Sequence, residues 1–404
     1  MKQNREYARA AVTRKAQKSI EEGHPWVYDT EITGIEGGYE NGGLVDVVSD
    51  RGAYLGTGFV SEKSKIRVRI LSRNANDRFD EAFWERRIRW AWDYRKTVMG
   101  EDASCCRVIF GEADQFPGLT VDRFGDVLVT QTLSAGIERL KPVLFPLLKK
   151  VLERDGQAVR GVYERNDAAI RELEGLAQGK GWYGGDGGPA RTEITENGIV
   201  YGVDFENGQK TGFFLDQKYN RRAVAKLARG RRVLDCFTHT GSFALNAAAG
   251  GAAHVCAVDV SADAVALAAE NARRNGLEGI VETKEANVFD LLPALEGGAE
   301  KYDFIILDPP AFTKSRKTVD RAERGYKEIN LRAMKLLPRG GYLATCSCSH
   351  FMIDGRFRRM LAAAAHDAGV QLRQIEARQQ SPDHPVLWNV PETDYLKFYL
   401  FQII

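Results

Sequence analysis

Two cysteines near the C-terminus are spaced so that they could act at one place. Cys346 and Cys348 lie in the segment GGYLATCSCSH, which is typical of a buried strand that runs into a loop. Side chains two positions apart on an extended strand point to the same side. A cysteine thiolate is a nucleophile that can bond covalently to a substrate. We therefore predict covalent chemistry at the end of this strand.

An acidic loop precedes the two cysteines in the chain. The segment YDFIILDPPAF is a predicted buried strand that leads into Asp308, Pro309 and Pro310. Proline fixes its own backbone angle and cannot donate to a strand ladder, so the two prolines end the strand and stiffen the loop. We expect this loop to hold the Asp308 carboxyl at the same edge of the sheet as the cysteines.

A third group of residues has the pattern of a nucleotide-binding β-α-β unit. Asp235 follows one predicted strand, Gly241 lies in the turn after it, and Asp259 ends the next strand. An open parallel sheet binds ligands at the carboxyl ends of its strands. Gly241 would let the backbone approach the ligand, and Asp259 would accept hydrogen bonds from a ribose diol.

The turn in this unit indicates the class of cofactor. It carries a single glycine, in DCFTHTGSF. A dinucleotide site would need the three-glycine fingerprint that cradles a pyrophosphate. The sequence therefore argues against a dehydrogenase and favours a cofactor without phosphates, such as S-adenosylmethionine (SAM).

A parallel sheet would bring these three groups of residues to one edge. From residue 189 onward, predicted strands alternate with helices, which indicates an α/β fold over 189–404. The Gly-rich stretch 179–188, GKGWYGGDGG, is the predicted linker before this domain.

Residues 1–73 are predicted to form a small β-rich domain that binds nucleic acid. Lys65, Arg67 and Arg69 alternate with aliphatic residues, so a strand there would bury its aliphatic face and display a row of cations. Such a row attracts phosphates, although a solvated strand edge has the same pattern. The first twenty positions add further basic residues: Lys2, Arg5, Arg9, Arg14, Lys15 and Lys18.

Residues 74–188 predict a central α+β domain. Apolar residues at helical spacing predict a helix over 80–99, and Gly125-Asp126 between apolar runs favours a hairpin turn. A second helix near 136–154 and a strand over 158–165 follow. The sequence assigns no chemistry to this domain.

The composition is that of a globular protein with several domains. The chain has 404 residues, of which 44% are hydrophobic and 28% charged, and a formal net charge of +2, so nucleic-acid binding depends on local basic patches. No segment is apolar over the length of a membrane span and the N-terminus lacks a secretory signal, which predicts a cytoplasmic protein. The cysteines and histidines lack metal-ligand spacing, so we expect reduced thiols and no metal site.

The chain resembles a known family at several of these motifs. Residues 233–350 look like the class I SAM-dependent methyltransferases. The segments GHPWVYDTEI and GFFLDQKYNR resemble the PUA-domain opening and the signature before the cofactor motif in bacterial large-subunit ribosomal RNA cytosine-5 methyltransferases. The resemblance covers essentially the whole chain. It implies a PUA-like RNA-binding domain, a central α+β domain and a Rossmann-like catalytic domain that methylates 23S ribosomal RNA with SAM, and it leaves a homodimer open.

The resemblance also implies roles for individual residues. Asp259 would bind the cofactor's ribose, and Asn287 would lie at its adenine, where many class I enzymes have aspartate. Asp308 would face the target base and contact the cofactor, with Gln217 as a neighbour of cofactor or base. The remaining residues would surround the methionine moiety of the cofactor: Asp235, Phe237, Thr238, Thr240, Gly241 and Phe243.

The implied reaction is methylation of cytosine at ring carbon 5. A thiolate adds to carbon 6 and makes carbon 5 nucleophilic enough to take the methyl group. Alignment on SCS puts this thiolate at Cys348, as in the family and in uridine-5 enzymes, whereas alignment on TCS puts it at Cys346, as in other cytosine-5 enzymes. Those other enzymes carry a second cysteine in the proline loop, where this chain has Ala311, so we favour Cys348.

Other functions share part of this pattern. An amino-group methyltransferase would have an aromatic residue directly after the two prolines, and this chain has Ala311 there. A guanine-modifying ribosomal enzyme would lack Cys346 and Cys348, whereas a uridine-5 enzyme would share the single-thiol mechanism. A protein that binds SAM and RNA without catalysis would differ only in activity, which the sequence leaves open.

Overall fold

The chain forms two compact units in the computed structural model, which describes residues 6–185, 187–313 and 315–404. Unit 1 comprises Met1–Ile194, Gly202–Leu215 and Pro382–Thr393. Unit 2 comprises Thr195–Tyr201, Asp216–Ser381 and Asp394–Ile404. Among the described residues, no helix combines the length and the apolar character that crossing a membrane requires.

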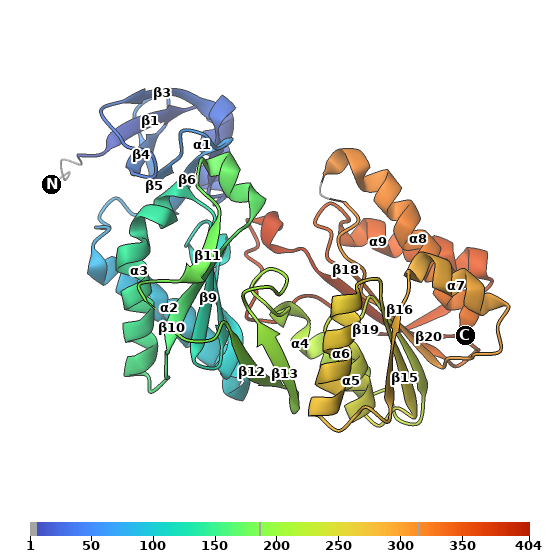
Figure 1. Cartoon of the computed structure of the whole chain (residues 1–404). Coiled ribbons are helices and arrows are strands. Elements are labelled where there is room, and N and C mark those ends of the chain that lie inside the picture. Colours follow the sequence, from blue (N-terminus) through green and yellow to red (C-terminus); the bar gives the residue numbers. More distant parts are fainter. Residues whose placement is uncertain (1–5, 186, 314) are drawn as a thin grey trace. The chain divides into compact units, whose positions relative to one another are not determined.

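Unit 1 begins with a six-stranded sheet in the order β2-β6-β5-β4-β1-β3 (Figure 1). β1 runs parallel to β4, and every other neighbouring pair is antiparallel. Alternate residues of β1 are buried, which gives the sheet an apolar inner face. The elements are β1 (Ala8–Val12), α1 (Arg14–Glu21), β2 (Trp26–Tyr28), β3 (Ile32–Glu36), β4 (Leu44–Val48), β5 (Tyr54–Val60) and β6 (Ile66–Ser72).

A second sheet in unit 1 has five strands in the order β11-β10-β9-β8-β7. The Asp80 side chain caps α2 by accepting from the Phe83 amide at 2.9 Å, and Gly125 turns the β8–β9 hairpin with a φ of 63°. These elements confirm the helix, hairpin and second helix predicted for 74–188. Their bounds are α2 (Glu81–Met99), β7 (Cys105–Phe110), β8 (Leu119–Phe124), β9 (Val127–Thr132), α3 (Ala135–Arg154), β10 (Gly161–Asn166) and β11 (Gly179–Trp182).

The predicted row of cations on β6 is wrong. Arg69 is 7% exposed and forms an ion pair with Glu174 at 2.8 Å. Arg67 donates to the carbonyl groups of Ser61 and Glu62. From Val68 to Ser72, successive residues of β6 are buried although they point to opposite faces of the sheet, so a cation there needs a partner. Lys65 precedes the strand and is exposed.

The basic residues of α1 form ion pairs but keep exposed side chains. Arg14 pairs with Asp50 at 3.5 Å and Lys15 with Glu31 at 3.1 Å. Lys2 and Arg5 lie outside the described residues.

The predicted linker at 179–188 is wrong for its first four residues. Gly179–Trp182 forms β11, which pairs antiparallel with β10. The division between the units falls later, inside a two-stranded sheet formed by β12 (Arg191–Glu196) and β13 (Ile199–Asp204). The division of the chain into domains at residues 73 and 188 stays a prediction.

Unit 2 is an α/β fold around a seven-stranded sheet in the order β16-β15-β14-β17-β18-β20-β19, in which β20 is antiparallel to both neighbours. It confirms the predicted Rossmann-like fold. Its elements include α4 (Lys218–Ala225), β14 (Arg232–Cys236), α5 (Ser242–Ala249), β15 (His254–Asp259), α6 (Ala262–Arg274), β16 (Val281–Glu285), α7 (Val288–Glu296), β17 (Phe304–Leu307), α8 (Val319–Leu336), β18 (Tyr342–Ser347), α9 (Asp354–Ala368), β19 (Leu372–Arg378) and β20 (Lys397–Ile403).

The order of the strands creates a switch point between β14 and β17. From β14 the chain moves outward to β15 and β16, and it then returns to the other side of β14 for β17 and β18. Because such connections are right-handed, the helices of the two halves cover opposite faces of the sheet. A crevice forms outside the carboxyl ends of the strands at such a point, and ligands bind there.

Candidate active site

The predicted site residues follow neighbouring strands of unit 2. Asp235 lies in β14, and Asp259 ends β15. Asp308 comes directly after β17, and Cys348 directly after β18. All four strands run parallel, so their carboxyl ends lie at one edge of the sheet.

Asp235 has one carboxylate oxygen with partners and one without. Its Oδ2 accepts from the Thr238 hydroxyl at 2.6 Å and from the Ala244 amide at 3.0 Å. Its Oδ1 is buried and has no partner among the described residues. Burial raises the pKa of Asp235 to about 7. A buried carboxylate oxygen without a partner suits a cationic donor, such as the ammonium group of a bound amino acid moiety.

The loop after β14 has a strained backbone. Phe237 and His239 are non-glycine residues with φ values of 65° and 49°. L-residues rarely adopt this left-handed region, and such strain clusters at ligand sites. The loop is held by hydrogen bonds from the Thr238 amide to the Val258 carbonyl and from the Gly241 amide to the Thr238 carbonyl, both at 2.9 Å.

Gly241 is required by the packing of the protein itself. Its φ is 80°, and a Cβ at this position would lie 3.0 Å from the Cβ of Ala268 in α6. The neighbouring Thr240 is buried, and its carbonyl accepts from the Asn271 side chain at 3.1 Å. The predicted role of Gly241 in admitting a ligand stays a prediction.

Asp259 and Asn287 have side chains fixed by backbone amides. Asp259 accepts from the His239 amide at 2.9 Å and from the Ser261 amide at 3.0 Å, which orients its carboxylate. Asn287 is exposed, and its Oδ1 caps α7 by accepting from the Phe289 amide at 3.0 Å. A carboxylate or amide oxygen can accept more than one hydrogen bond. Asp259 can therefore still accept from a ribose hydroxyl, and Asn287 from the adenine amino group.

Asp308 is the end of a chain of side-chain hydrogen bonds. Asn220 donates to Gln217 at 2.6 Å, and Gln217 donates to the Asp308 carboxyl at 3.0 Å. The structure thus brings Gln217 and Asp308 together. Burial of the Asp308 carboxyl among protein atoms raises its pKa to about 7, and the Asp216 carboxylate adds to this shift. Asp308 is therefore in the range where it can hold or release a proton at neutral pH.

The two cysteines have different surroundings. Cys346 is fully buried, and its thiol contacts Asp308 and Gln217. Burial and the Asp308 carboxylate raise the pKa of Cys346 well above its ordinary value, which keeps it a neutral thiol. Cys348 is partly exposed, and its Sγ lies 3.9 Å from the Pro309 carbonyl oxygen. Of the two thiols, only that of Cys348 is open to a substrate.

A buried lysine beside Cys348 was not predicted from the sequence. Lys397 opens β20 opposite Ser347 of β18 and is 6% exposed. Its ammonium donates to the carbonyls of Ser349 at 2.8 Å and Tyr395 at 2.7 Å. Burial lowers the pKa of Lys397 to about 8, and its interaction with Cys348 opposes this shift. The available signal was a single lysine at the head of the apolar run KFYLFQII.

A buried ion pair lies close to Phe243 of α5. Arg221 of α4 pairs with Glu196 at 2.5 Å, and both side chains are nearly inaccessible to solvent. The Arg221 guanidinium lies 6.0 Å from the ring centre of Phe243. Phe243 is itself buried and stacks on Phe398 of β20, so its ring packs against the sheet. The Arg221 charge also opposes the rise in the pKa of Asp308.

Comparison with protein families agrees with this geometry. Residues 11–73 match a model described as a PUA-like domain. Residues 178–402, more than half of the chain, match a model described as S-adenosylmethionine-dependent methyltransferase. The chain belongs to the SAM-dependent methyltransferase family. Its cofactor is therefore SAM, as the single-glycine turn predicted, and the free Oδ1 of Asp235 fits the ammonium group of that cofactor.

Relatives of this methyltransferase align over nearly its whole length. It is 37% identical to ribosomal RNA large subunit methyltransferase I of Klebsiella pneumoniae strain 342 over 98% of this chain and 99% of the relative. It is 38% identical to the protein of the same name from Salmonella arizonae, over 98% of both chains.

Solved structures share the fold of this methyltransferase. A proposed SAM-dependent methyltransferase from Streptococcus mutans superposes with a TM-score of 0.81 at 22% identity, over 98% of this chain and 99% of that one. The crystal structure of SMU.776 in complex with SAH, the demethylated cofactor, superposes with a TM-score of 0.83 at 22% identity, over the same shares of the two chains.

Proposed function

We propose that this methyltransferase forms 5-methylcytosine in 23S ribosomal RNA through a covalent bond between Cys348 and the target base. The observation that carries the proposal is the partly exposed Cys348 thiol, which lies beside a buried ammonium and follows the strand next to the Asp308 loop. The full-length similarity to large-subunit ribosomal RNA methyltransferases supports the class of substrate. A ribosomal RNA substrate also fits a cytoplasmic location.

Cys348 begins the proposed reaction. Cytosine carbon 5 is too weak a nucleophile to take a methyl group directly, so the Cys348 thiolate first adds to ring carbon 6. Carbon 5 then carries the electron pair that forms the new bond. SAM, when bound, supplies the methyl group on a sulfonium centre. A base removes the proton from carbon 5, and the thiolate leaves as the aromatic ring is restored.

The neighbouring side chains favour this sequence of steps. The Lys397 ammonium stabilises the Cys348 thiolate before attack, because a nearby cation lowers the pKa of a thiol. Asp308, whose pKa is raised to about 7, donates its proton to ring nitrogen 3 as the thiolate adds, and takes the proton back when the thiolate leaves. Gln217 holds the Asp308 carboxyl through the 3.0 Å hydrogen bond.

Methyl transfer from labelled SAM to unmodified 23S ribosomal RNA, followed by digestion to nucleosides, tests this function. The wild type, Cys348→Ala and Cys346→Ala are measured in parallel. We expect label in 5-methylcytosine with the wild type, loss of label with Cys348→Ala, and retained label with Cys346→Ala.

Other outcomes would contradict the proposal in distinct ways. Label in 5-methyluridine or in a methylated guanine would show that the target base is uracil or guanine and not cytosine. Activity that survives both substitutions would exclude the covalent step. A wild type that binds SAM and RNA but transfers no methyl group would indicate a binding protein without catalysis.

A further inference from the structure

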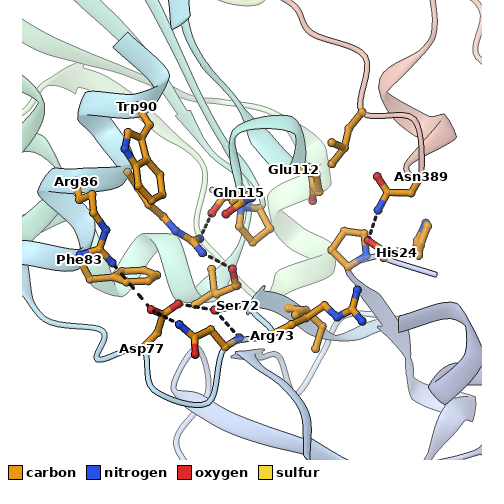
Figure 2. Close-up of a pocket in the computed structure, with 18 residues that line it drawn as sticks. His24, Ser72, Arg73, Asp77, Phe83, Arg86, Trp90, Glu112, Gln115 and Asn389 are labelled. Carbon is orange, nitrogen blue, oxygen red and sulfur yellow. Dashed lines mark hydrogen bonds and ion pairs between the residues drawn. The ribbon is translucent and has the colours of Figure 1, made fainter. Parts of the chain in front are cut away.

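Unit 1 contains a pocket that the proposed catalysis does not use. Its volume is about 500 Å³, which suits a ligand of nucleotide size. Its wall combines the turn after α1, the end of β6, helix α2 and a loop after β7 (Figure 2). Asn389, from the late segment of unit 1, closes another side.

Arg87 places a buried cation in the wall of this pocket. The residue is 6% exposed, and its guanidinium donates to the carbonyls of Leu71 at 2.6 Å and Gln115 at 2.9 Å. Burial lowers the pKa of Arg87 to about 10, which leaves it charged at neutral pH. Among the described residues, no carboxylate lies within ion-pair distance of Arg87, although the Asp77 charge opposes the fall in its pKa and its guanidinium lies 4.3 Å from the centre of the Phe83 ring. A buried cation that no carboxylate contacts directly would be stabilised by a bound anion.

An aromatic face lies beside this cation. Trp90 also lines the pocket from α2, yet it is 57% exposed. The Arg86 guanidinium lies 5.5 Å from the centre of the Trp90 ring, and the two side chains extend from the same helix (Figure 2). An exposed indole next to cations is the arrangement on which nucleic-acid bases stack.

The remaining charges leave the pocket cationic. Arg73 is exposed and forms no ion pair with the described residues. The wall holds two carboxylates: Asp77 accepts from the Ser72 hydroxyl at 2.5 Å and pairs with Arg86 at 4.0 Å, and Glu112 accepts from the Trp26 indole at 3.0 Å. Against these two, the wall carries Arg73, Arg86 and Arg87, so the arginines exceed the carboxylates by one charge.

We propose that this pocket binds one nucleotide of the RNA substrate, with the base stacked on Trp90 and the phosphate beside Arg73 and Arg87. The proposal rests on the proposed function for the identity of the ligand as RNA. A flat aromatic face next to positive charge suits a nucleotide better than a phosphopeptide, because a peptide phosphate would leave the indole without a stacking partner. The pocket would then hold the RNA at a point outside the catalytic unit.

Equilibrium binding of full-length protein to an unmodified 23S ribosomal RNA transcript tests this site without requiring methyl transfer. We expect Trp90→Ala to raise Kd about ten-fold through lost stacking, and Trp90→Phe to restore most of the affinity. Arg73→Gln should weaken binding and reduce the slope of log Kd against log salt by about one. The melting temperature and SAM binding serve as the folding checks, and neither should change.

Arg89→Gln is the matched control, because Arg89 is exposed on the same helix and does not line the pocket. Equal losses from Arg73→Gln and Arg89→Gln would overturn the proposal in favour of diffuse charge attraction. Unchanged RNA affinity in Trp90→Ala would overturn it as well, as would binding of a phosphopeptide in preference to RNA. If the wild type transfers no methyl group but the pocket variants lose RNA affinity as expected, the result would support the pocket and contradict the proposed catalysis.

Discussion

At the scale of single residues, Lys397 should control the reactivity of Cys348. Replacing it with methionine keeps the length of the side chain and removes the charge, so the pKa of the Cys348 thiol should rise. The rate at which iodoacetamide alkylates Cys348 can be followed by peptide mass spectrometry. We expect the pH dependence of this rate to shift to higher pH in the variant. Methyl transfer at pH 7 should fall about ten-fold or more and recover in part at pH 9.

A purely structural role for Lys397 would give a different result. In that case Lys397→Met would lower the melting temperature and the SAM affinity, while the pH profile of alkylation at Cys348 would stay where it is in the wild type. Lys397→Arg, which keeps the charge, should preserve most of the profile.

Asp308 should lower stability at neutral pH because its folded-state pKa is raised from 3.8 to about 7. Between these two values the unfolded chain ionises while the folded protein keeps the proton, so the free energy of unfolding falls as pH rises and the cost is complete above about pH 7. Three pKa units correspond to an upper limit of about 4 kcal/mol. Asp308→Asn should therefore melt higher than the wild type at pH 8, with little gain at pH 4, and should lose methyl transfer.

The melting temperatures of the two proteins at both pH values check this prediction. A gain from Asp308→Asn that is equal at pH 4 and pH 8 would mean that ionisation of Asp308 is not the source of the cost.

At the scale of elements, the loop between β14 and α5 depends on Gly241. Gly241→Ala forces a side chain into a left-handed backbone position and against Ala268, so it should lower the free energy of unfolding by more than about 2 kcal/mol and weaken SAM binding. Gly276→Ala is the control: its φ is 65°, and a Cβ there meets nothing within 4 Å. It should cost only about 1 kcal/mol and leave SAM affinity unchanged, as measured by denaturant unfolding and calorimetric titration. Equal effects of the two substitutions would show that contact with α6 is unimportant.

The elements also show where sequence reasoning succeeds. The alternation of strands and helices after residue 189 predicted the parallel sheet, since burial on both faces produces continuous apolar runs such as FIIL in β17. The same local reading failed at β6, because the burial of Arg69 depends on Glu174, which lies far away in the sequence. It failed at Gly179–Trp182 for the same reason: a glycine-rich segment becomes a strand when a neighbouring strand pairs with it.

At the scale of the whole molecule, the candidate site could be predicted only in part. The motifs that follow strand ends placed Asp235, Asp259 and Asp308 at one edge of unit 2, because the topology of a parallel sheet fixes where those ends meet. Lys397 required knowledge of the register between β18 and β20. That register depends on long-range pairing, which one sequence does not reveal.

The covalent bond to Cys348 is the central claim, and trapping it is the most direct test. RNA in which the target cytosine carries fluorine at ring carbon 5 has no proton to lose there, so the thiolate cannot leave after methyl transfer. We predict that the wild type with SAM and this RNA forms a stable complex, and that mass spectrometry locates the nucleotide on Cys348. An adduct on Cys346, or turnover of unmodified RNA without any adduct on the fluorinated RNA, would contradict the account.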